Sequence, residues 1–105
     1  MHCVRPSASD RPLSRAEAEA MLASLPGWAL VDEARAIERR FAFQNFAEAF
    51  AFAARVAEVA EREDHHPDLC VGWGYCTVRF STHKIGGLHR NDFVMAAKVD
   101  RLFES

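Results

Sequence analysis

The sequence predicts an α+β fold in which a four-stranded antiparallel sheet carries three helices on one of its faces. Segments with helical and with strand periodicity follow one another in the order helix, strand, strand, helix, strand, strand, helix. Only a short turn separates the two strands of each pair, which favours antiparallel hairpins. With the helices gathered on one face, the other face of the sheet must be exposed to water or covered by a partner.

The length and composition are those of a single soluble domain. The chain has 105 residues, of which 50% are hydrophobic and 27% are charged. A net charge of -2 without a basic stripe argues against direct binding of nucleic acid. The apolar stretches are too short to span a membrane, and the N-terminus lacks the apolar segment of a signal peptide. Residues 1–12 are expected to be a disordered lead-in, and residues 13–105 form the domain.

The cysteines indicate where the protein resides. Cys3 lies in the lead-in, whereas Cys70 and Cys76 lie in the domain. An odd, sparse number of cysteines without regular spacing is typical of reduced thiols. The sequence therefore predicts a cytoplasmic protein without disulfides.

The first helix is expected between residues 13 and 25. Ser14 and Glu17 have the spacing of a capping box, and Pro26 with the following glycine ends the helix. Its short apolar stripe consists of Met21, Leu22 and Leu25.

Two strands should follow, joined by a turn at Asp32 to Ala34. Alternation along the second strand places Ile37, Phe41 and Phe43 on one face. Arg39 shares that parity, so a charged side chain interrupts an otherwise apolar face.

The second helix is the most clearly marked element. Asn45 can cap it, and Glu48 would complete a capping box. Phe52 and Val59 fall outside the predicted core stripe, either as scattered surface side chains or as a second buried face at a subunit interface. The helix must end before Pro67. The predicted core stripe is Phe46, Ala49, Phe50, Ala53, Ala57 and Ala60.

A second hairpin and a closing helix complete the pattern. The hairpin turn is expected at Gly74-Tyr75, with glycine in the first position. Alternation should place His83 at the end of the later strand, on its polar face. The core side of that strand comprises Cys76, Val78 and Phe80, and its polar side comprises Thr77, Arg79 and Ser81. After a glycine loop, the closing helix presents Met95, Val99, Leu102 and Phe103 as its apolar stripe.

Four polar residues stand at the ends of these elements and form the candidate site. His65 and His66 follow the second helix, His83 ends a strand, and Asp92 lies near the start of the last helix. Histidine transfers protons near neutral pH, so several histidines together suggest acid–base chemistry. The simpler alternatives are solvated loop histidines and, for Asp92, a first-turn acid favoured by the helix dipole.

Two other chemistries are weaker alternatives. Three histidines and a carboxylate are credible ligands for zinc or iron, but adjacent histidines before a proline have poor chelating geometry. For nucleophilic catalysis, the spacing of Ser81 and His83 places their backbones roughly 7 Å apart, too far for a direct hydrogen bond.

Several motifs together resemble the pterin-4a-carbinolamine dehydratase family. They are ExxxHHP at Glu61 to Pro67, Trp73, STH at Ser81 to His83, GGL at Gly86 to Leu88, and Asp92. The resemblance extends from Leu13 to the C-terminus. Two positions depart from the family pattern. Leu69 stands where the family commonly has tryptophan. His89 stands where it usually has serine or threonine, and histidine is a poorer helix cap.

The resemblance implies a 4a-hydroxytetrahydrobiopterin dehydratase that needs neither a metal nor an organic cofactor. Such an enzyme converts 4a-hydroxytetrahydropterin to quinonoid dihydropterin, which links it to an aromatic amino acid hydroxylase. Family members form homodimers or homotetramers. The implied catalytic residues are His65, His66, His83 and Asp92; the implied substrate contacts are Asp64, His65, His66, Ser81, Thr82, His83 and Lys84; Glu61 and Trp73 are supporting residues.

The residues fit this mechanism on chemical grounds as well. Loss of the 4a-hydroxyl needs an acid for the departing oxygen and a base for the N5 proton. We assign the first role to His65 and the second to His83, with His66 and Asp92 orienting the substrate and the partner imidazole. The alternative is a non-enzymatic binding module, since some family members bind a transcription factor through a helical surface. In that case Phe52 and Val59 could contact the partner.

Overall fold

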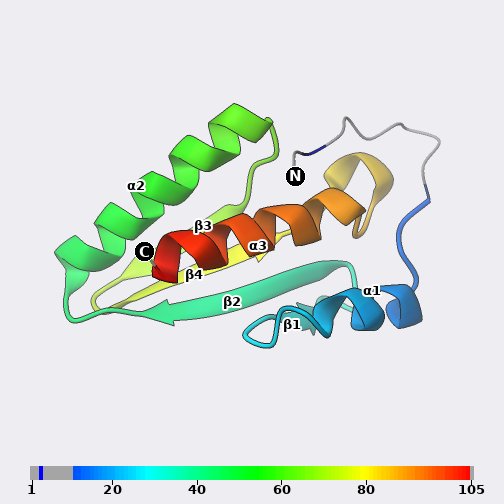
Figure 1. Cartoon of the computed structure of the whole chain (residues 1–105), viewed down its shortest axis with the longest axis horizontal. Coiled ribbons are helices and arrows are strands. Elements are labelled where there is room, and N and C mark those ends of the chain that lie inside the picture. The colour runs from blue at the N-terminus through cyan, green and yellow to red at the C-terminus, as the bar shows by residue number, and fades with distance from the viewer. Residues whose placement is uncertain (1–2, 4–10, 105) are drawn as a thin grey trace.

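The computed structural model describes Cys3 and residues 11–104. It confirms the α+β prediction: the four strands form one antiparallel sheet in the order β1-β2-β4-β3 (Figure 1). The remaining residues of the predicted disordered lead-in, 1–2 and 4–10, lie outside the described part. The elements are α1 (Arg15–Leu22), β1 (Ala29–Val31), β2 (Ala36–Ala42), α2 (Phe46–Glu63), β3 (Asp68–Gly72), β4 (Tyr75–Phe80), the 3₁₀ turn η1 (His83–Ile85) and α3 (Arg90–Glu104).

The first helix begins as its sequence predicts. The hydroxyl of Ser14 accepts the Glu17 N–H at 3.1 Å, and the Glu17 carboxylate accepts the Ser14 N–H at 2.8 Å. The helix ends at Leu22, so Leu25 reaches the core from the segment that follows it. None of the described helices is both long and apolar enough to cross a membrane.

The β1–β2 hairpin has its turn at the predicted residues, and Arg39 has a structural role in the core. Its guanidinium lies 4.4 Å from the centre of the Phe41 ring and donates a 2.8 Å hydrogen bond to Asp100 of α3. Asp100 also accepts the indole N–H of Trp28 at 2.9 Å. The charge on the apolar face is therefore paired, and it ties β2 to α3.

The predicted core stripe of α2 is partly wrong. The buried face is Ala49, Phe52, Ala53, Val56, Val59 and Ala60. Phe52 and Val59 thus belong to the core of this chain. By contrast, Phe46 and Phe50 are 47% and 58% exposed and stack on each other, and Ala57 is exposed as well. Apolar residues lie on two faces of this helix, so helical periodicity alone could not decide which face packs against the sheet.

The cap of α2 is confirmed except for one bond. Asn45 Oδ1 accepts the Glu48 N–H at 2.9 Å, as predicted. The Glu48 carboxylate instead accepts the N–H of Gln44 at 3.3 Å, one residue before the cap, so the reciprocal bond of a capping box is not formed.

The second hairpin turns one residue earlier than predicted. Gly72 pairs with Tyr75, so Trp73 and Gly74 form the turn, with Gly74 at φ 85° in its second position. The core side of β4 is confirmed, because Cys76, Val78 and Phe80 are all buried. However, β4 ends at Phe80, and His83 opens the 3₁₀ turn η1 instead of extending the strand.

The strand register determines which loops meet. Ile37 of β2 and Asp68 of β3 pair with Phe80 and Arg79, near the end of β4. The β1–β2 turn and the α2–β3 loop therefore both lie at the sheet end where η1 begins. This placement agrees with the expectation that the two adjacent histidines reach the sheet end that carries His83.

Candidate active site

A buried carboxylate forms the centre of the candidate site. Asp92, in the first turn of α3, is 0% exposed. One of its oxygens accepts hydrogen bonds from the Thr82 hydroxyl and the His89 N–H, both at 2.9 Å. The other oxygen lies 2.6 Å from Nε2 of His65. Because each of these three groups can donate, both carboxylate oxygens are engaged as acceptors.

His65 is held in place by the end of α2. The helix ends at Asp64, which adopts a left-handed φ of 53°, and the His65 N–H still donates to the Ala60 carbonyl at 3.2 Å. The imidazole is 8% exposed and stacks on Phe80, with ring centres 6.2 Å apart. Since Asp92 engages Nε2, Nδ1 is the nitrogen that remains to exchange a proton with a ligand.

Thr82 connects this buried pair to the turn that carries His83. Its backbone forms an isolated bridge with Gly87, with N···O distances of 2.8 and 3.4 Å. Gly86 closes the turn at φ 71°, a left-handed conformation that suits glycine. The bridge between Thr82 and Gly87 thus fixes both ends of the turn, and His83 and Lys84 within it are exposed.

His89 and Asp92 cap the start of α3. Its ring Nδ1 accepts the Asn91 N–H at 3.0 Å, while Asp92 accepts the N–H of His89 itself. Imidazole and carboxylate together thus satisfy two N–H groups at the helix start.

His66 points away from the buried pair. Its imidazole is exposed, and its Nε2 contacts the carboxylate of Glu61 one turn earlier on α2. The predicted supporting residue Glu61 thus contacts one of the predicted catalytic histidines. Asp64, between these residues, is exposed at the end of the helix.

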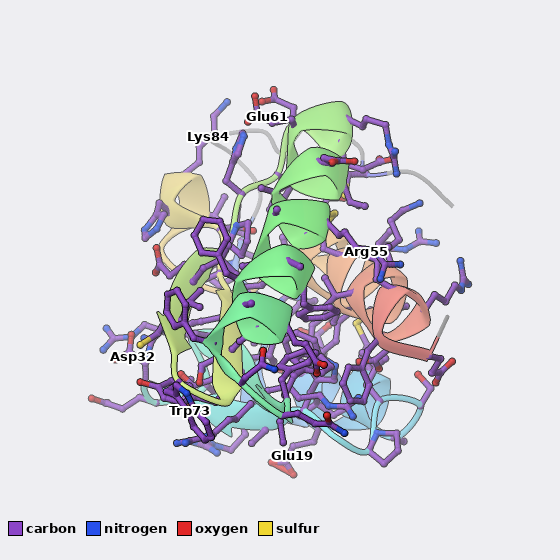
Figure 2. The ribbon with its side chains drawn as sticks, turned by 90° about the vertical axis from the view of Figure 1, so that its left-hand side faces the viewer. Glu19, Asp32, Arg55, Glu61, Trp73 and Lys84 are labelled. Carbon is purple, nitrogen blue, oxygen red and sulfur yellow. The ribbon has the colours of Figure 1, made fainter. Side chains whose placement is uncertain are left out.

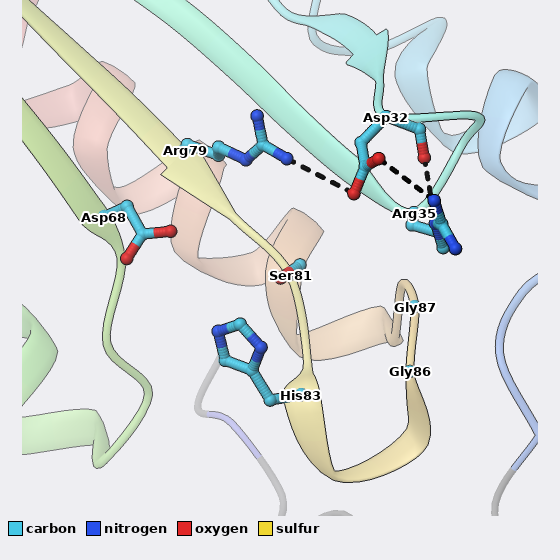
Figure 3. Close-up of a pocket in the computed structure, with 8 residues that line it drawn as sticks. All are labelled: Asp32, Arg35, Asp68, Arg79, Ser81, His83, Gly86 and Gly87. Atoms are coloured by element: carbon cyan, nitrogen blue, oxygen red, sulfur yellow. Dashed lines mark hydrogen bonds and ion pairs between the residues drawn. The ribbon is translucent and has the colours of Figure 1, made fainter.

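His83 lines a polar cavity of about 380 Å³ at the end of β4 (Figure 3). Within the described part of the chain, its imidazole has no hydrogen-bond partner, so both ring nitrogens are available to a ligand. Lys84 is exposed and does not line the cavity. The other lining residues are Asp32, Arg35, Asp68, Arg79, Ser81, Gly86 and Gly87.

The structure thus groups the predicted site residues in three sets. Asp92 contacts both His65 and Thr82, Ser81 lines the same cavity as His83, and Glu61 contacts His66. Trp73 belongs to none of them: it is 74% exposed at the opposite end of the β3–β4 hairpin. Figure 2 shows Trp73 and the pair Glu61 and Lys84 toward opposite ends of α2.

Four charged residues of the cavity were not predicted. Arg79 precedes Ser81 by two positions, and Asp68 pairs with Arg79, so strand alternation could have indicated both. Asp32 and Arg35 come from the β1–β2 turn, and only the strand order β1-β2-β4 brings that turn beside η1. No sequence signal marks that contact.

The alternative of a metal site finds no ligand set in the described residues. Among Cys3 and residues 11–104, no group of three His, Cys, Asp or Glu side chains is placed to hold a metal ion. Instead, His65 is bonded to Asp92, His66 contacts Glu61, and His83 lines the cavity.

Sequence relatives share most of this chain. One from Halorhodospira halophila is 55% identical over 100 residues, which cover 95% of this chain and 92% of the relative. One from Methylococcus capsulatus is 57% identical over 91 residues, which cover 87% and 80%. Both carry the name pterin-4-alpha-carbinolamine dehydratase as a provisional assignment.

Solved structures share the fold. A Brucella melitensis crystal structure, described as a transcriptional coactivator/pterin dehydratase, matches with a TM-score of 0.81 and 36% identity, covering 88% of this chain and 98% of that one. A pterin dehydratase-like protein described as a RuBisCO assembly factor in the alpha-carboxysome matches with a TM-score of 0.64 and 25% identity, covering 75% and 92%. The family model described as pterin 4 alpha carbinolamine dehydratase matches residues 11–102. By this match and by its relatives, the chain belongs to the pterin-4a-carbinolamine dehydratase family.

Proposed function

We propose that the protein dehydrates 4a-hydroxytetrahydropterin to quinonoid dihydropterin and water by histidine acid–base catalysis. The observation that carries this proposal is the buried pair of His65 and Asp92 at the sheet end where His83 faces a cavity. A buried imidazole with one nitrogen held by a carboxylate is arranged for proton transfer at the other nitrogen.

The reaction requires two proton transfers. The bond between C4a and the hydroxyl oxygen breaks, and the His65 imidazolium gives its Nδ1 proton to that oxygen, which leaves as water while Nε2–H stays on Asp92. The N5 proton passes to His83, and its bonding electrons form the double bond between N5 and C4a. Because His83 is exposed, it can release its proton to solvent, and a proton must return to Nδ1 of the buried His65 before the next turnover.

The other predicted residues orient these groups. Asp92 holds the ring of His65 in one tautomer, and Glu61 holds the ring of His66. The proposal needs no metal and no organic cofactor. It places the protein in the cytoplasm as a homo-oligomer, linked to an aromatic amino acid hydroxylase whose 4a-hydroxylated pterin it recycles.

The test is an assay on freshly generated 4a-carbinolamine after treatment of the purified protein with a chelator. We expect turnover above the uncatalysed rate, unchanged by chelation. Metal at about one ion per chain, together with loss of activity on chelation, would instead support a metal enzyme. Absence of turnover would leave the binding-module alternative.

One observation favours that alternative as a second candidate function. The outer face of α2 carries the stacked, exposed Phe46 and Phe50, as a helix that docks on another protein would. This face replaces Phe52 and Val59 as the predicted contact surface. A binding role alone would not require the buried pair of His65 and Asp92, so replacing His65 should leave partner binding intact.

A further inference from the structure

The cavity beside His83 contains polar groups that the proton transfers do not use. Asp68 and Arg79 are direct partners in the β3–β4 register, so their side chains project from the same face of the sheet. Within the described part of the chain, the Asp68 carboxylate has no hydrogen bond or ion pair, and Figure 3 shows it facing the cavity. An unpaired carboxylate in a cavity is available to a ligand that donates hydrogen bonds.

Arg79 is oriented by the β1–β2 turn. Its guanidinium lies 3.4 Å from one carboxylate oxygen of Asp32, and Arg35 holds the other at 3.1 Å (Figure 3). One edge of the Arg79 guanidinium is therefore engaged, and the remaining N–H groups are left for a ligand.

The turn that supplies Asp32 has a costly backbone conformation. Asp32, Glu33 and Ala34 have φ values of 53°, 55° and 66°, a region that residues other than glycine rarely adopt. Such strain persists where the surrounding structure over-determines it, and it clusters at ligand sites. Here the strained turn brings Asp32 against Arg79 at the wall of the cavity.

We propose that Asp68 and Arg79 bind the pyrimidine edge of the pterin ring. This inference rests on the proposed function for its substrate class. The edge presents two adjacent donors, the 2-amino group and N3–H, followed by the O4 acceptor. A carboxylate accepts two parallel N–H bonds, and a guanidinium donates to a carbonyl oxygen, so the pair matches the edge in order and in polarity.

The placement agrees with the proposed chemistry. O4 and N5 are neighbours on the bicyclic ring, on the side that carries the reacting C4a atom. Arg79 and Ser81 are about 7 Å apart along the chain direction by strand rise, and His83 lies beyond Ser81. The ring would thus extend from the Asp68 and Arg79 pair toward His83. A cavity of about 380 Å³ is within the usual range for small-molecule sites.

Charge balance further defines the ligand. Asp32 and Asp68 carry two negative charges and Arg35 and Arg79 two positive ones, so the cavity favours a neutral polar ring over an ion. A neutral ring that lacked the 2-amino donor would place an acceptor against Asp68. Lumazine, which has a 2-oxo group in that position, is such a ring.

The test compares the binding of pterin and lumazine, two stable ligands, by fluorescence titration at a pH where both are neutral. The wild-type protein should prefer pterin. Asp68→Asn should weaken pterin binding by roughly 10- to 100-fold and change lumazine binding little. Arg79→Gln should weaken both, because both ligands carry O4. Glu58→Gln, on the exposed side of α2, is the matched control and should change neither.

Three outcomes would overturn the inference: no pterin binding by the wild type, equal loss of pterin and lumazine in Asp68→Asn, or full pterin affinity in that variant. Thermal unfolding of each variant shows whether it is folded. The inference and the proposed function can fail separately. An inactive wild type with an Asp68-dependent preference for pterin would refute only the dehydratase proposal. An active wild type whose preference does not depend on Asp68 would refute only the inference.

Discussion

Nε2 of His65 lies 2.6 Å from a carboxylate oxygen of Asp92, although 27 positions separate the two residues. His65 follows the end of α2, Asp92 opens α3, and Thr82 of the loop after β4 donates to the same carboxylate. The pair therefore depends on the relative placement of two helices and one loop. Any variant that shifts α2 against α3 should disturb the chemistry before it unfolds the protein.

Replacement of the histidines should separate turnover from stability. His65→Ala and His83→Ala should each lower turnover by roughly 10²–10⁴-fold. If the two residues act as a unit, the double variant should lose less turnover than the product of the two single losses. His83 is exposed, so its alanine variant should unfold like the wild type. His65→Ala removes a hydrogen-bond partner from the buried Asp92 and should lower the free energy of unfolding by about 1–3 kcal/mol.

Turnover and thermal unfolding are measured on the same preparations. If turnover per folded molecule stayed at the wild-type level while the melting temperature of His65→Ala fell, the histidine would be structural and the acid–base role wrong.

Asp92→Asn should impair catalysis through the tautomer of His65. An amide that keeps its oxygen toward Thr82 and His89 turns its NH₂ group toward Nε2 of His65, which must then accept. The proton then sits on Nδ1 of a neutral imidazole, which is a much weaker acid than the imidazolium that the Asp92 carboxylate stabilises, so turnover should fall by roughly 10²–10⁴-fold.

The matched control for Asp92→Asn is Thr82→Val, which removes a hydrogen bond to the same carboxylate but leaves the tautomer unchanged. It should lower stability but leave the dependence of turnover on pH unchanged. Equal losses of turnover in both variants would show that Asp92 acts only as a structural acceptor.

The protein should be a homo-oligomer. Phe46 and Phe50 form a stacked apolar pair on the outer face of α2, together with exposed Ala47, Ala51 and Ala54. In addition, none of the described helices covers the second face of the sheet. Light scattering in the tens of micromolar range should give a multiple of the 11.8 kDa chain mass. Phe50→Glu should reduce that mass, whereas Glu58→Gln should not. A wild-type mass of one chain would exclude the prediction.

The cysteines should react at different rates. Cys70 is exposed, whereas burial raises the pKa of the Cys76 thiol and, with the Glu63 carboxylate, raises that of Cys3 to about 11. A raised pKa leaves less of the Cys76 and Cys3 thiols as thiolate near neutral pH, and the thiolate is the reactive form. A maleimide should label one thiol quickly in the native protein, and Cys70→Ser should remove that fast phase.

Three thiols should react once the protein is denatured without reductant. A smaller number would indicate a disulfide, contrary to the expectation of reduced cysteines.

The sequence by itself determined the features that depend on near neighbours in the chain. Ser14 and Glu17 predicted a capping box, Asn45 predicted a helix start, and alternation along β4 separated its buried side from its polar side. These patterns arise from hydrogen bonds and side-chain directions over a few residues, so they are visible without the fold. The family motifs added the four candidate catalytic residues, each of which lies at the end of an element.

Only the tertiary structure decided what lies far apart in the chain and close in space. The apolar residues on both sides of α2 allowed two orientations, and packing on the sheet buried Phe52 instead of Phe46. Contact between Asp32 and Arg79 requires the order β1-β2-β4, and contact between His65 and Asp92 requires α2 to pack beside α3. Such contacts follow from burying one common core, a property of the whole chain that no local pattern carries.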